Sequence, residues 1–498
     1  MSERVEKLQR LCRVAAPVML LWLAAATVSA QPFEDVFGPP GASDRGARRV
    51  TPVSACPDAA GGGFIAVGTT VAPGTTPDVL VVRTDPTGAT LWERTYDIGP
   101  GRADLGQALA EAKDGSGYVI TGLSAGPVTG LDVLLLRIDC AGEPLWAQTY
   151  FGPGPLSEVG FDVVEAKTGT PALGTQPGDI LVAGLAINPA NSTRDSMLMR
   201  TRSDGTMIWN QRYNISSAHE FFRALTEASP TVGAAGTDDV VGVGLFAIGT
   251  AVQGYAVRVN GNTGLIGAAP QGAAIYGGAD VESFESVVEL QAAPLAGNLV
   301  MVGSTRSPAT ASDIWAVRTG PSPAALLAQR RIGVPVGAPL AEEVALDVNE
   351  VTHPLAIAAP GRLALTGHAG QPGTPADDAF LLIVDQASLA PMGTGRLFGD
   401  HAGLRDWGVS LDDHPTGFII AGFSESNLEG SAPPDPRDLY LINTDPSGRT
   451  RCSRDWDVPS LATQFRVTPI PQQAVHFLES RRQPVTSVRR DTRIPICP

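Results

Sequence analysis

Short apolar runs of strand length, separated by turn residues, recur along the whole chain. Residues 104–152 show this pattern most clearly, with apolar runs at Ala108–Ala112, Tyr118–Thr121, Val133–Ile138 and Leu145–Tyr150. Each run is long enough for a strand and too short for a helix, and the segments between the runs are rich in Gly, Pro and Asp. The stretch therefore predicts four consecutive antiparallel strands, a small sheet that needs neighbouring sheets to bury both of its faces.

The second run of this stretch has seven versions along the chain, each ending in glycine. The terminal glycines lie 54 to 65 residues apart, in the segments Phe64–Gly68, Tyr118–Gly122, Ile180–Gly184, Leu245–Gly249, Leu299–Gly303, Leu363–Gly367 and Phe418–Gly422. Seven four-stranded sheets in sequence predict an all-β, seven-bladed β-propeller of antiparallel blades, because radial packing buries both faces of each blade. A linear β-solenoid is the alternative, but its coils are usually shorter than this spacing.

The repeat also predicts how the chain is divided. We expect a linker at residues 31–43, a propeller at residues 44–458 and a short β-like tail at residues 459–498, which either closes the ring or forms a small appendage. The expected blades are residues 44–99, 104–152, 158–214, 220–277, 282–333, 343–399 and 406–458.

Residues 1–30 have the composition of an export signal. Basic residues precede residue 14, an apolar core follows at Val14–Val28, and Val28–Ala30 fits a small-residue cleavage sequence. An uncleaved membrane anchor is the alternative, but the apolar run is short for a spanning helix and contains Pro17. We therefore expect a secreted, periplasmic or cell-surface protein of bacterial export type, with no membrane span after signal cleavage.

Composition and charge narrow the class of partner. With 56 Gly, 41 Pro and 43% hydrophobic residues, the chain suits a turn-dense β protein better than a disordered one. Its formal net charge of −15 argues against nucleic acid and against anionic membrane surfaces. An acidic chain is more soluble, which is the simpler interpretation of this charge. The alternative is that the charge attracts cationic partners. We expect a monomer.

Four cysteines follow the predicted signal, namely Cys56, Cys140, Cys452 and Cys497. An even number in an exported protein predicts two disulfides, with three pairings open. Cys452 lies just before the tail, which favours a Cys452–Cys497 bridge that tethers it. Cys56 and Cys140 fall in turns on the same face of adjacent blades, which favours the second bridge. The absence of C-x-x-C spacing gives no support to a zinc or thioredoxin-like site.

Three stretches carry a resemblance to known sequences. GGGFIAVG (61–68), PDVLVVRTDPTGATLWERTY (77–96) and TGFIIAG (416–422) resemble the repeats of secreted bacterial β-propeller proteins, which carry units of the type GGFIIAG…DxYLIKTDxxGxxLWxxTYGG. The resemblance covers residues 44–458. It implies an architecture and no chemistry, because the shared residues are those of strands and turns. Trp92, Trp146 and Trp209 within these units are best interpreted as packing between blades.

An acid begins the first strand of every copy, and these acids are the candidate ligand site. Together they would form a carboxylate ring near one axial mouth, where hard cations such as Ca²⁺ find several oxygen ligands. The alternative is that each acid caps backbone N–H groups of the incoming loop, and no D-x-D-x-D-G calcium loop is present. No cofactor is predicted beyond this possible Ca²⁺. The ring consists of Asp44, Asp104, Glu158, Glu220, Glu282, Glu343 and Asp406.

A second acid near the end of the first strand and an arginine at the end of the third strand also recur. Strand direction places both at the same face, which predicts structural ion pairs in preference to a triad of arginines for a substrate carboxylate. These residues could pair within or between blades, as Glu111 with Arg137, Glu165 with Arg200, Glu227 with Arg258 and Glu289 with Arg318.

No nucleophile elbow, phosphate loop or paired histidine motif is present, so no catalytic residue is predicted and an enzyme is not the first hypothesis. The leading hypothesis is a binding or scaffold module whose ligand is an unknown protein, glycan or cation. Its expected surface is the acidic face that carries the loops between second and third strands, including Phe423–Arg437, because loops of varied length on a regular scaffold build ligand surfaces. The alternatives are a propeller-type glycan hydrolase or lyase and a purely structural envelope component.

Overall fold

The structure, a computed structural model, describes residues 32–38, 43–56, 62–99, 101–154, 156–214, 218–229, 238–278, 281–306, 311–333, 342–355, 357, 359–370, 376–399, 404–425, 437–456, 460–462, 466–470, 473–475, 479–483, 486–490 and 494–495. Side chains are not described for residues 43–45 or for the strands after residue 456. The predicted signal at residues 1–30 and Cys497 lie outside the described residues. Within these ranges the chain is all-β, with the short 3-10 turn η1 (Pro171–Leu173) as the helical element.

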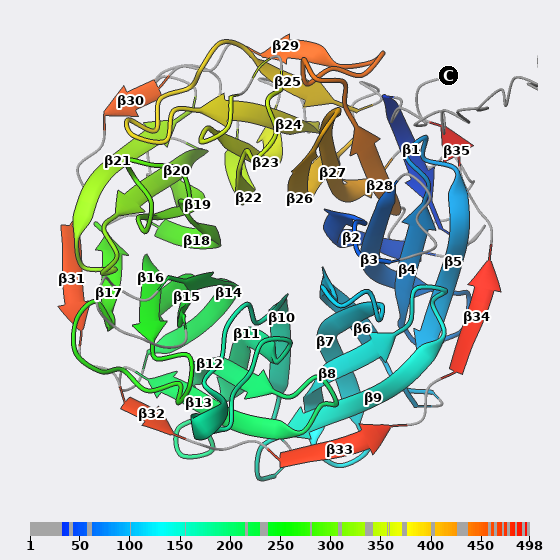
Figure 1. Ribbon diagram of the computed structural model, residues 1–498, viewed down its shortest axis with the longest axis vertical. Coiled ribbons are helices and arrows are strands. Elements are labelled where there is room, and N and C mark those ends of the chain that lie inside the picture. The colour runs from blue at the N-terminus through cyan, green and yellow to red at the C-terminus, as the bar shows by residue number, and fades with distance from the viewer. Residues whose placement is uncertain are drawn as a thin grey trace, which may run out of the picture.

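The strands group into antiparallel units, called here units 1 to 7 in chain order, around a central opening (Figure 1). The innermost strands are β2 (Ser43–Pro52), β6 (Asp104–Glu111), β10 (Glu158–Glu165), β14 (His219–Ala228), β18 (Val281–Glu289), β22 (Glu343–Glu350) and β26 (Asp406–His414). The second strands are β3 (Phe64–Val71), β7 (Tyr118–Gly126), β11 (Ile180–Ile187), β15 (Asp239–Ile248), β19 (Leu299–Arg306), β23 (Leu363–Gly370) and β27 (Gly417–Ser424).

The third strands are β4 (Asp78–Thr84), β8 (Gly130–Ile138), β12 (Arg194–Thr201), β16 (Ala251–Val259), β20 (Ser312–Thr319), β24 (Asp377–Val384) and β28 (Asp438–Asn443). The fourth strands of units 1 to 6 are β5 (Thr90–Asp97), β9 (Pro144–Phe151), β13 (Met207–Asn214), β17 (Gly272–Gly277), β21 (Leu326–Ile332) and β25 (Gly395–Phe398). Units 4 and 5 also touch through one parallel pair, Val252 with Val281, so their strands form one continuous sheet.

Unit 7 takes its fourth strand from the other end of the chain. β1 (Phe33–Phe37) pairs with β28 in the register Phe33 to Asn443 through Phe37 to Leu439. Residues 31–43 were expected to be a linker, and that prediction is wrong at this strand. The reason is structural: the last unit has an open edge, and hydrogen bonding to β1 satisfies that edge and ties the two ends of the chain together.

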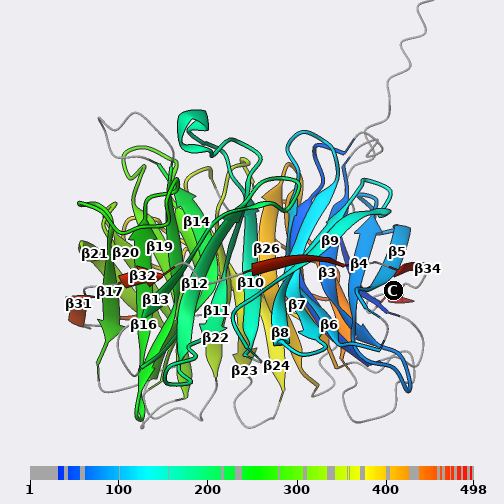
Figure 2. The same ribbon diagram turned by 90° about the horizontal axis from the view of Figure 1, so that it is seen from below.

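The segment after unit 7 runs around the outside of the molecule. It consists of β29 (Arg454–Trp456), β30 (Ser460–Ala462), β31 (Arg466–Ile470), β32 (Gln473–Val475), β33 (Glu479–Gln483), β34 (Thr486–Arg490) and β35 (Ile494–Pro495). These strands pair in turn with the outer strands of units 6, 5, 4, 3, 2 and 1 and then with β1. Figures 1 and 2 show them lying along the rim. The tail was expected either to close the ring of units or to form a separate appendage, and the strands paired along the rim agree with the first expectation. Residues 454–456, which were assigned to the seventh blade, pair with unit 6.

Apolar cores lie between successive units. One core joins Ile65 and Val81 of unit 1 to Leu134 and Leu136 of unit 2, and equivalent clusters follow at each later junction. Another cluster joins Leu439 of unit 7 to unit 1. Each sheet thus buries both faces against its neighbours, which a four-stranded sheet needs for stability.

The recurring glycine of the second strand has a steric cause. In every unit the first strand contains an extra residue, a β-bulge, opposite this glycine. A Cβ on Gly122 would lie 1.8 Å from the carbonyl oxygen of Leu105 on the bulged strand. A side chain therefore cannot be accommodated there, and the sequence pattern records the bulge.

Unit 4 corrects the predicted alignment. The bulge at Phe222 and Ala224 faces Gly244, whose added Cβ would meet the Phe221 oxygen at 2.0 Å. Gly249, which the sequence pattern selected, instead lies in the turn after β15, where an added Cβ would meet nothing within 4 Å. The apolar run continues past the glycine in this unit, so the sequence alone placed the motif five residues too late.

Candidate functional site

The acids that begin the first strands are buried between units. Asp104 and Glu220 are 0% exposed and Glu158 is 1% exposed, so these side chains do not line an open channel. Glu282, Glu343 and Asp406 are also at most 1% exposed, and the side chain of Asp44 lies outside the described residues. The six described carboxylates of the predicted ring are therefore buried and not exposed at an open mouth.

These acids cap the segment that arrives from the preceding unit, which was the alternative interpretation. Ile98 N donates to Asp104 Oδ2 at 2.7 Å, and Gly278 N donates to Glu282 Oε2 at 3.4 Å. Burial raises the pKa of Asp104 to about 6 and the pKa of Glu158 to about 7. Hydrogen bonds oppose the shift, from the Ser124 hydroxyl and Ile98 N at Asp104 and from the backbone at Glu158.

The second acids have other partners than those predicted. Each reaches back to backbone N–H groups of the preceding unit: Glu165 accepts from Lys113 N at 2.8 Å, and Glu227 accepts from Lys167 N at 2.7 Å. Glu111 accepts from the three successive N–H groups of residues 54–56, and Glu289 accepts from Ser229 N. In units 6 and 7, Glu350 and Asp413 do the same.

The four predicted ion pairs are thus wrong. Arg200 pairs with Asp179 at 2.9 Å with both side chains 0% exposed, and Arg258 pairs with Asp239 at 2.8 Å. Arg137 lies 3.9 Å from Asp114, and Arg318 donates to the Ala387 carbonyl. Backbone N–H groups of the preceding unit occupy the second acids, and three of the arginines pair instead with other acids of their own unit.

The Cys56–Cys140 disulfide is confirmed and joins units 1 and 2 across 84 residues of sequence. Cys452 is also disulfide-bonded, while Cys497, its predicted partner, lies outside the described residues. The packing role predicted for tryptophan also holds at this junction, where Trp92 Nε1 donates to the Cys140 carbonyl at 3.2 Å.

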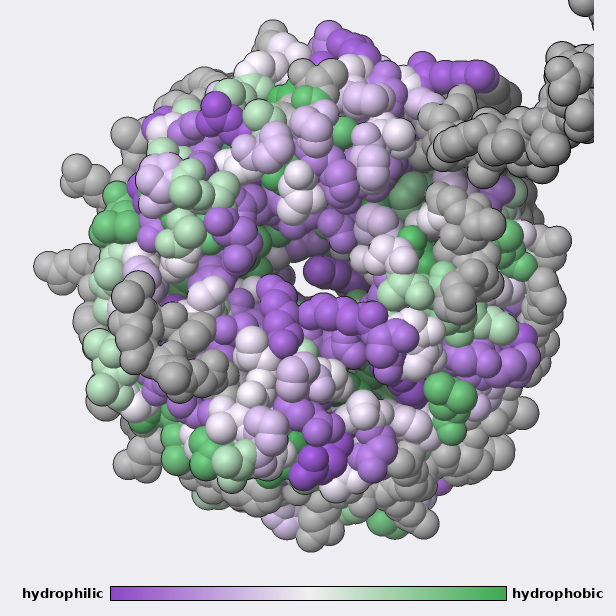
Figure 3. All heavy atoms as spheres, viewed as in Figure 1, coloured by the Kyte–Doolittle hydropathy of each residue, from purple (hydrophilic) through white to green (hydrophobic). Residues whose placement is uncertain are grey.

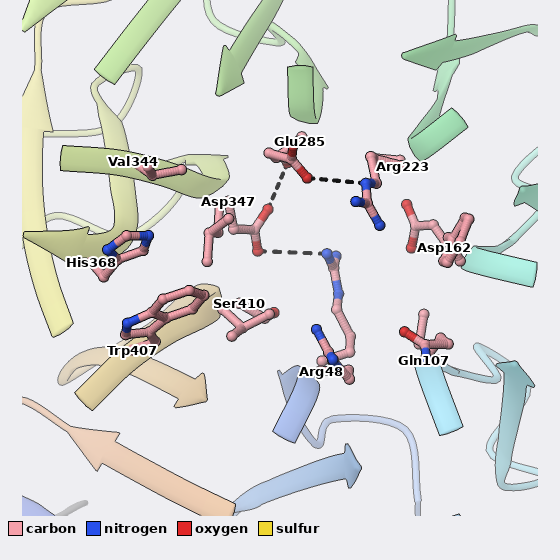
Figure 4. A pocket seen from close by; sticks show the side chains of 17 residues that line it. Arg48, Gln107, Asp162, Arg223, Glu285, Val344, Asp347, His368, Trp407 and Ser410 are labelled. Carbon is pink, nitrogen blue, oxygen red and sulfur yellow. Dashed lines mark hydrogen bonds and ion pairs between the residues drawn. The ribbon is translucent and has the colours of Figure 1, made fainter. Parts of the chain in front are cut away.

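A cavity of about 360 Å³ lies in the central channel and is lined mainly by residues at or beside the bulges (Figure 4). The space-filling view shows the opening rimmed by hydrophilic side chains (Figure 3). The residues at the first position of the bulge differ from unit to unit: Arg48, Gln107, Phe161, Arg223, Glu285, Leu346 and Val409.

The second position of the bulge builds the wall of the channel. Asp162 Oδ2 accepts from Leu225 N of the next unit at 2.9 Å, and Asp347 Oδ2 accepts from Leu411 N of the next unit at 2.9 Å. Asp162 is 7% exposed and Asp347 is 5% exposed. Burial raises the pKa of Asp162 to about 6, and the neighbouring Arg49 guanidinium opposes the shift. These two carboxylates therefore lie largely buried at the cavity wall, where backbone N–H groups donate to both and the Ser286 hydroxyl donates to Asp347 at 2.6 Å.

Arginine side chains also line the cavity, and Arg223 extends into it (Figure 4). Arg49 lies 3.6 Å from Asp347 with 36% of its side chain exposed, and Arg223 lies 3.3 Å from Glu285 with 38% exposed. Burial disfavours the charged form of Arg49, but the carboxylates around it outweigh this and raise its pKa. Solvent in the channel therefore reaches positively charged side chains, although the chain as a whole carries a formal net charge of −15.

Aromatic rings border the cavity on two sides. His368 stacks on Trp407 with ring centroids 3.9 Å apart, and burial lowers the pKa of His368 to about 3, so its ring is neutral at pH 7. On another side the guanidinium of Arg223 lies 5.2 Å from the ring of Phe161 and 4.8 Å from the ring of Phe221. These contacts fix the orientation of Arg223.

Sequence reasoning did not select any of these channel residues. It searched for recurring acids and for breaks in loop length, including Phe423–Arg437, of which residues 426–436 lie outside the described part of the chain. The sequence did carry a signal, but it was variation and not recurrence. Within the otherwise regular first strand, the residue at the first position of the bulge changes between copies, from Gln107 to Phe161 to Arg223. When one equivalent position varies among strands that otherwise repeat, its side chain lies on a face that the fold does not constrain.

One group of acids has the spacing that a metal ion requires. Within the described ranges, carboxylate oxygens of Asp78, Asp97 and Asp104 lie within 4.8 Å of one another, at the junction of units 1 and 2. Asp104 was among the predicted cation ligands, and the other two acids, Asp78 and Asp97, belong to the preceding unit.

Among the described residues, no helix is both long and apolar enough to cross a membrane. No model of a known protein family matches the chain, and no curated protein matches it either. Among solved structures, the chain is similar to the crystal structure of the V. cholerae biofilm matrix protein Bap1, at 11% identity over 83% of this chain and 91% of that chain. The TM-score of that match is 0.22, a likeness too weak to support an inference about fold or function.

Proposed function

We propose that the chain is an exported seven-bladed β-propeller that acts as a binding module, with its ligand held in the central channel. The arrangement of units around one opening, the cores between successive units and the pairing of β1 with unit 7 support the propeller. The Cys56–Cys140 disulfide supports an oxidising, extracytoplasmic location.

The variation at the bulges carries the binding proposal. Seven structurally equivalent positions face one cavity of about 360 Å³ and hold residues of every chemical class. The stability of the fold repeats the glycines and the second acids but does not fix these positions, so their side chains can be adapted to a ligand. Small-ligand sites are concave and combine apolar and aromatic lining with a few convergent polar groups, and this cavity has both kinds of lining residue.

The accessible charge indicates the class of ligand. Carboxylates Asp162 and Asp347 are engaged by backbone N–H groups, whereas Arg49 and Arg223 are more than a third exposed. Arginine binds carboxylates through two parallel hydrogen bonds. The ligand we propose is therefore a glycan segment that carries carboxylate groups, rather than the cation suggested by the overall charge.

The test is calorimetric titration of the full chain with oligosaccharides of uronic acids and, in parallel, neutral oligosaccharides of equal length. We expect binding of the acidic series, and about tenfold weaker binding for Arg49→Ala or Arg223→Ala, equivalent to about 1.4 kcal/mol each. Arg202→Ala, in the turn between β12 and β13, is the matched control and should bind as the wild type does. Equal affinity for both series, or loss of binding with Arg202→Ala alone, would refute the proposal.

A further inference from the structure

One arginine of unit 1 is surrounded by carboxylates of three other units. The guanidinium of Arg49, on β2, lies 3.6 Å from the carboxylate of Asp347, on β22 of unit 6. The negative charges of Asp162 in unit 3 and Asp412 in unit 7 also act on Arg49. Figure 4 shows Asp162 and Asp347 on opposite sides of the cavity. One positive charge is therefore shared among carboxylates of units 3, 6 and 7, and an anionic ligand has to compete with them for it.

Neutral donors hold two of these carboxylates in place. Asp162 accepts a hydrogen bond from Leu225 N at 2.9 Å. Asp412 accepts from Asn349 Nδ2 at 2.8 Å and from the Thr51 hydroxyl at 3.3 Å. These donors carry no charge, and a carboxyl group keeps an acceptor oxygen when it is protonated. Protonation therefore changes the charge of the channel without removing the contacts that build its wall.

The charges around the cavity balance closely when every acid is ionised. They are three guanidinium groups and four carboxylates, namely Arg48, Arg49, Arg223, Asp162, Glu285, Asp347 and Asp412. The imidazole of His368 is neutral at pH 7. Asp413, which follows Asp412, is engaged at the junction, where His353 Nδ1 lies 2.8 Å from its Oδ2. Two protons taken up by the four carboxylates therefore change the balance from negative to positive, which favours an anionic ligand.

Two of the four carboxylates take up protons near pH 6. Burial raises the pKa of Asp162 to about 6 and the pKa of Asp412 to about 6, although the Arg49 guanidinium opposes both shifts. The carboxylate of Asp413 adds to the shift at Asp412. Above this pH both acids are ionised and compensate Arg49, and below it they are neutral. A sugar carboxylate, with an ordinary carboxyl pKa of about 4, remains mostly ionised over the same range.

We propose that protonation of Asp162 and Asp412 controls the affinity of the channel for acidic glycans, which bind more tightly as the pH falls from about 8 to about 5. This inference rests on the proposed function and concerns the regulation of the same site. Loss of the two negative charges leaves Asp347 as the carboxylate beside Arg49, so a ligand carboxylate competes with one acid instead of three. By linkage, a bound anion disfavours the ionised form of both acids, and binding takes up protons.

The experiment is calorimetric titration of the full chain with one uronic acid oligosaccharide at about pH 8 and at about pH 5, at constant ionic strength. We expect binding to be about tenfold tighter or more at the lower pH. At an intermediate pH, two buffers of different ionisation enthalpy should reveal proton uptake on binding. Equal affinities at the two pH values, or binding without proton uptake, would overturn this inference and leave the proposed function in place. Absence of binding at both pH values would overturn both.

The double variant Asp162→Asn and Asp412→Asn isolates the two acids. It should bind at about pH 8 as tightly as the wild type does at about pH 5, with little further change as the pH falls. Asp104→Asn is the matched control, because the pKa of Asp104 is also about 6 but its side chain is buried at the junction of units 1 and 2 and does not line the cavity. It should keep the wild-type response. A pH response that persists in the double variant, with folding checked by circular dichroism, or that disappears in Asp104→Asn, would refute the assignment.

Discussion

At the junctions between units, an acid at the end of each first strand captures backbone N–H groups of the unit before it, from Glu111 in unit 2 to Asp413 in unit 7. At the bulges of the same strands, the side chains that face the channel share no chemistry, as Gln107, Phe161 and Arg223 show. The two regions lie on the same strands and differ in what they must do. Junction residues are constrained by a backbone that repeats, whereas the contacts of the channel residues differ from unit to unit, as those of Arg223 with Glu285 and Phe161 show.

The largest expected effect tests the bulge that separates the two regions. Gly244→Ala places a Cβ 2.0 Å from the Phe221 oxygen, so the bulge must distort or the sheet must separate. We expect a loss of about 3 kcal/mol or more in the free energy of unfolding, measured by urea denaturation.

Gly249→Ala is the matched control for that experiment. Gly249 has open space around it but a φ of +60°, so alanine there should cost about 1 kcal/mol through backbone strain alone. If both variants lose the same stability, Gly244 is not the glycine that the bulge requires in unit 4.

A second variant compares the regions directly. Glu350 is 5% exposed and accepts from Ala292 N at 3.0 Å as well as from Gln291 N. Glu350→Ala leaves both N–H groups without this partner and should lower the free energy of unfolding by about 2 kcal/mol. Gln107→Ala, at a bulge, should change it by less than about 0.5 kcal/mol. Similar losses in urea denaturation would remove the distinction between junction and channel.

The last prediction concerns an effect that is spread over several pH units. Burial, and after it the charge of Arg405, lowers the pKa of His368 to about 3. The unfolded state therefore takes up a proton near pH 6.5 that the folded state refuses until about pH 3, so stability is lost as the pH falls through this window. The slope is at most about 1.4 kcal/mol per pH unit.

His368→Gln removes that contribution and leaves the other titrating groups in place. The difference in unfolding free energy between wild type and variant should shift against the wild type as the pH falls from 7 to 4. Parallel pH profiles, measured by urea denaturation at each pH, would show that His368 is protonated in the folded protein, contrary to its neutral state against Trp407.

The sequence by itself determined the strands and the turns. Alternating apolar runs, turn glycines and the glycine of the second strand each reflect local geometry, so units 1 to 3 and 5 to 7 could be aligned from residues alone. The Cys56–Cys140 pair could be inferred for the same reason, since antiparallel order fixes which turns share a face. Where an apolar run extended beyond its glycine, as in unit 4, local pattern could not fix the register.

Only the tertiary structure decided which groups meet across a junction. The position of Glu165 in its strand is visible in sequence, but its partner is Lys113 N of the unit before it, and Arg200 takes Asp179 instead. The sequence pattern also does not predict which strands pair with β1 or with the outer strands after residue 453. Any open sheet edge offers them the same backbone groups. The channel depended on the structure most of all, since side chains from seven distant strands converge there only when the units surround one axis.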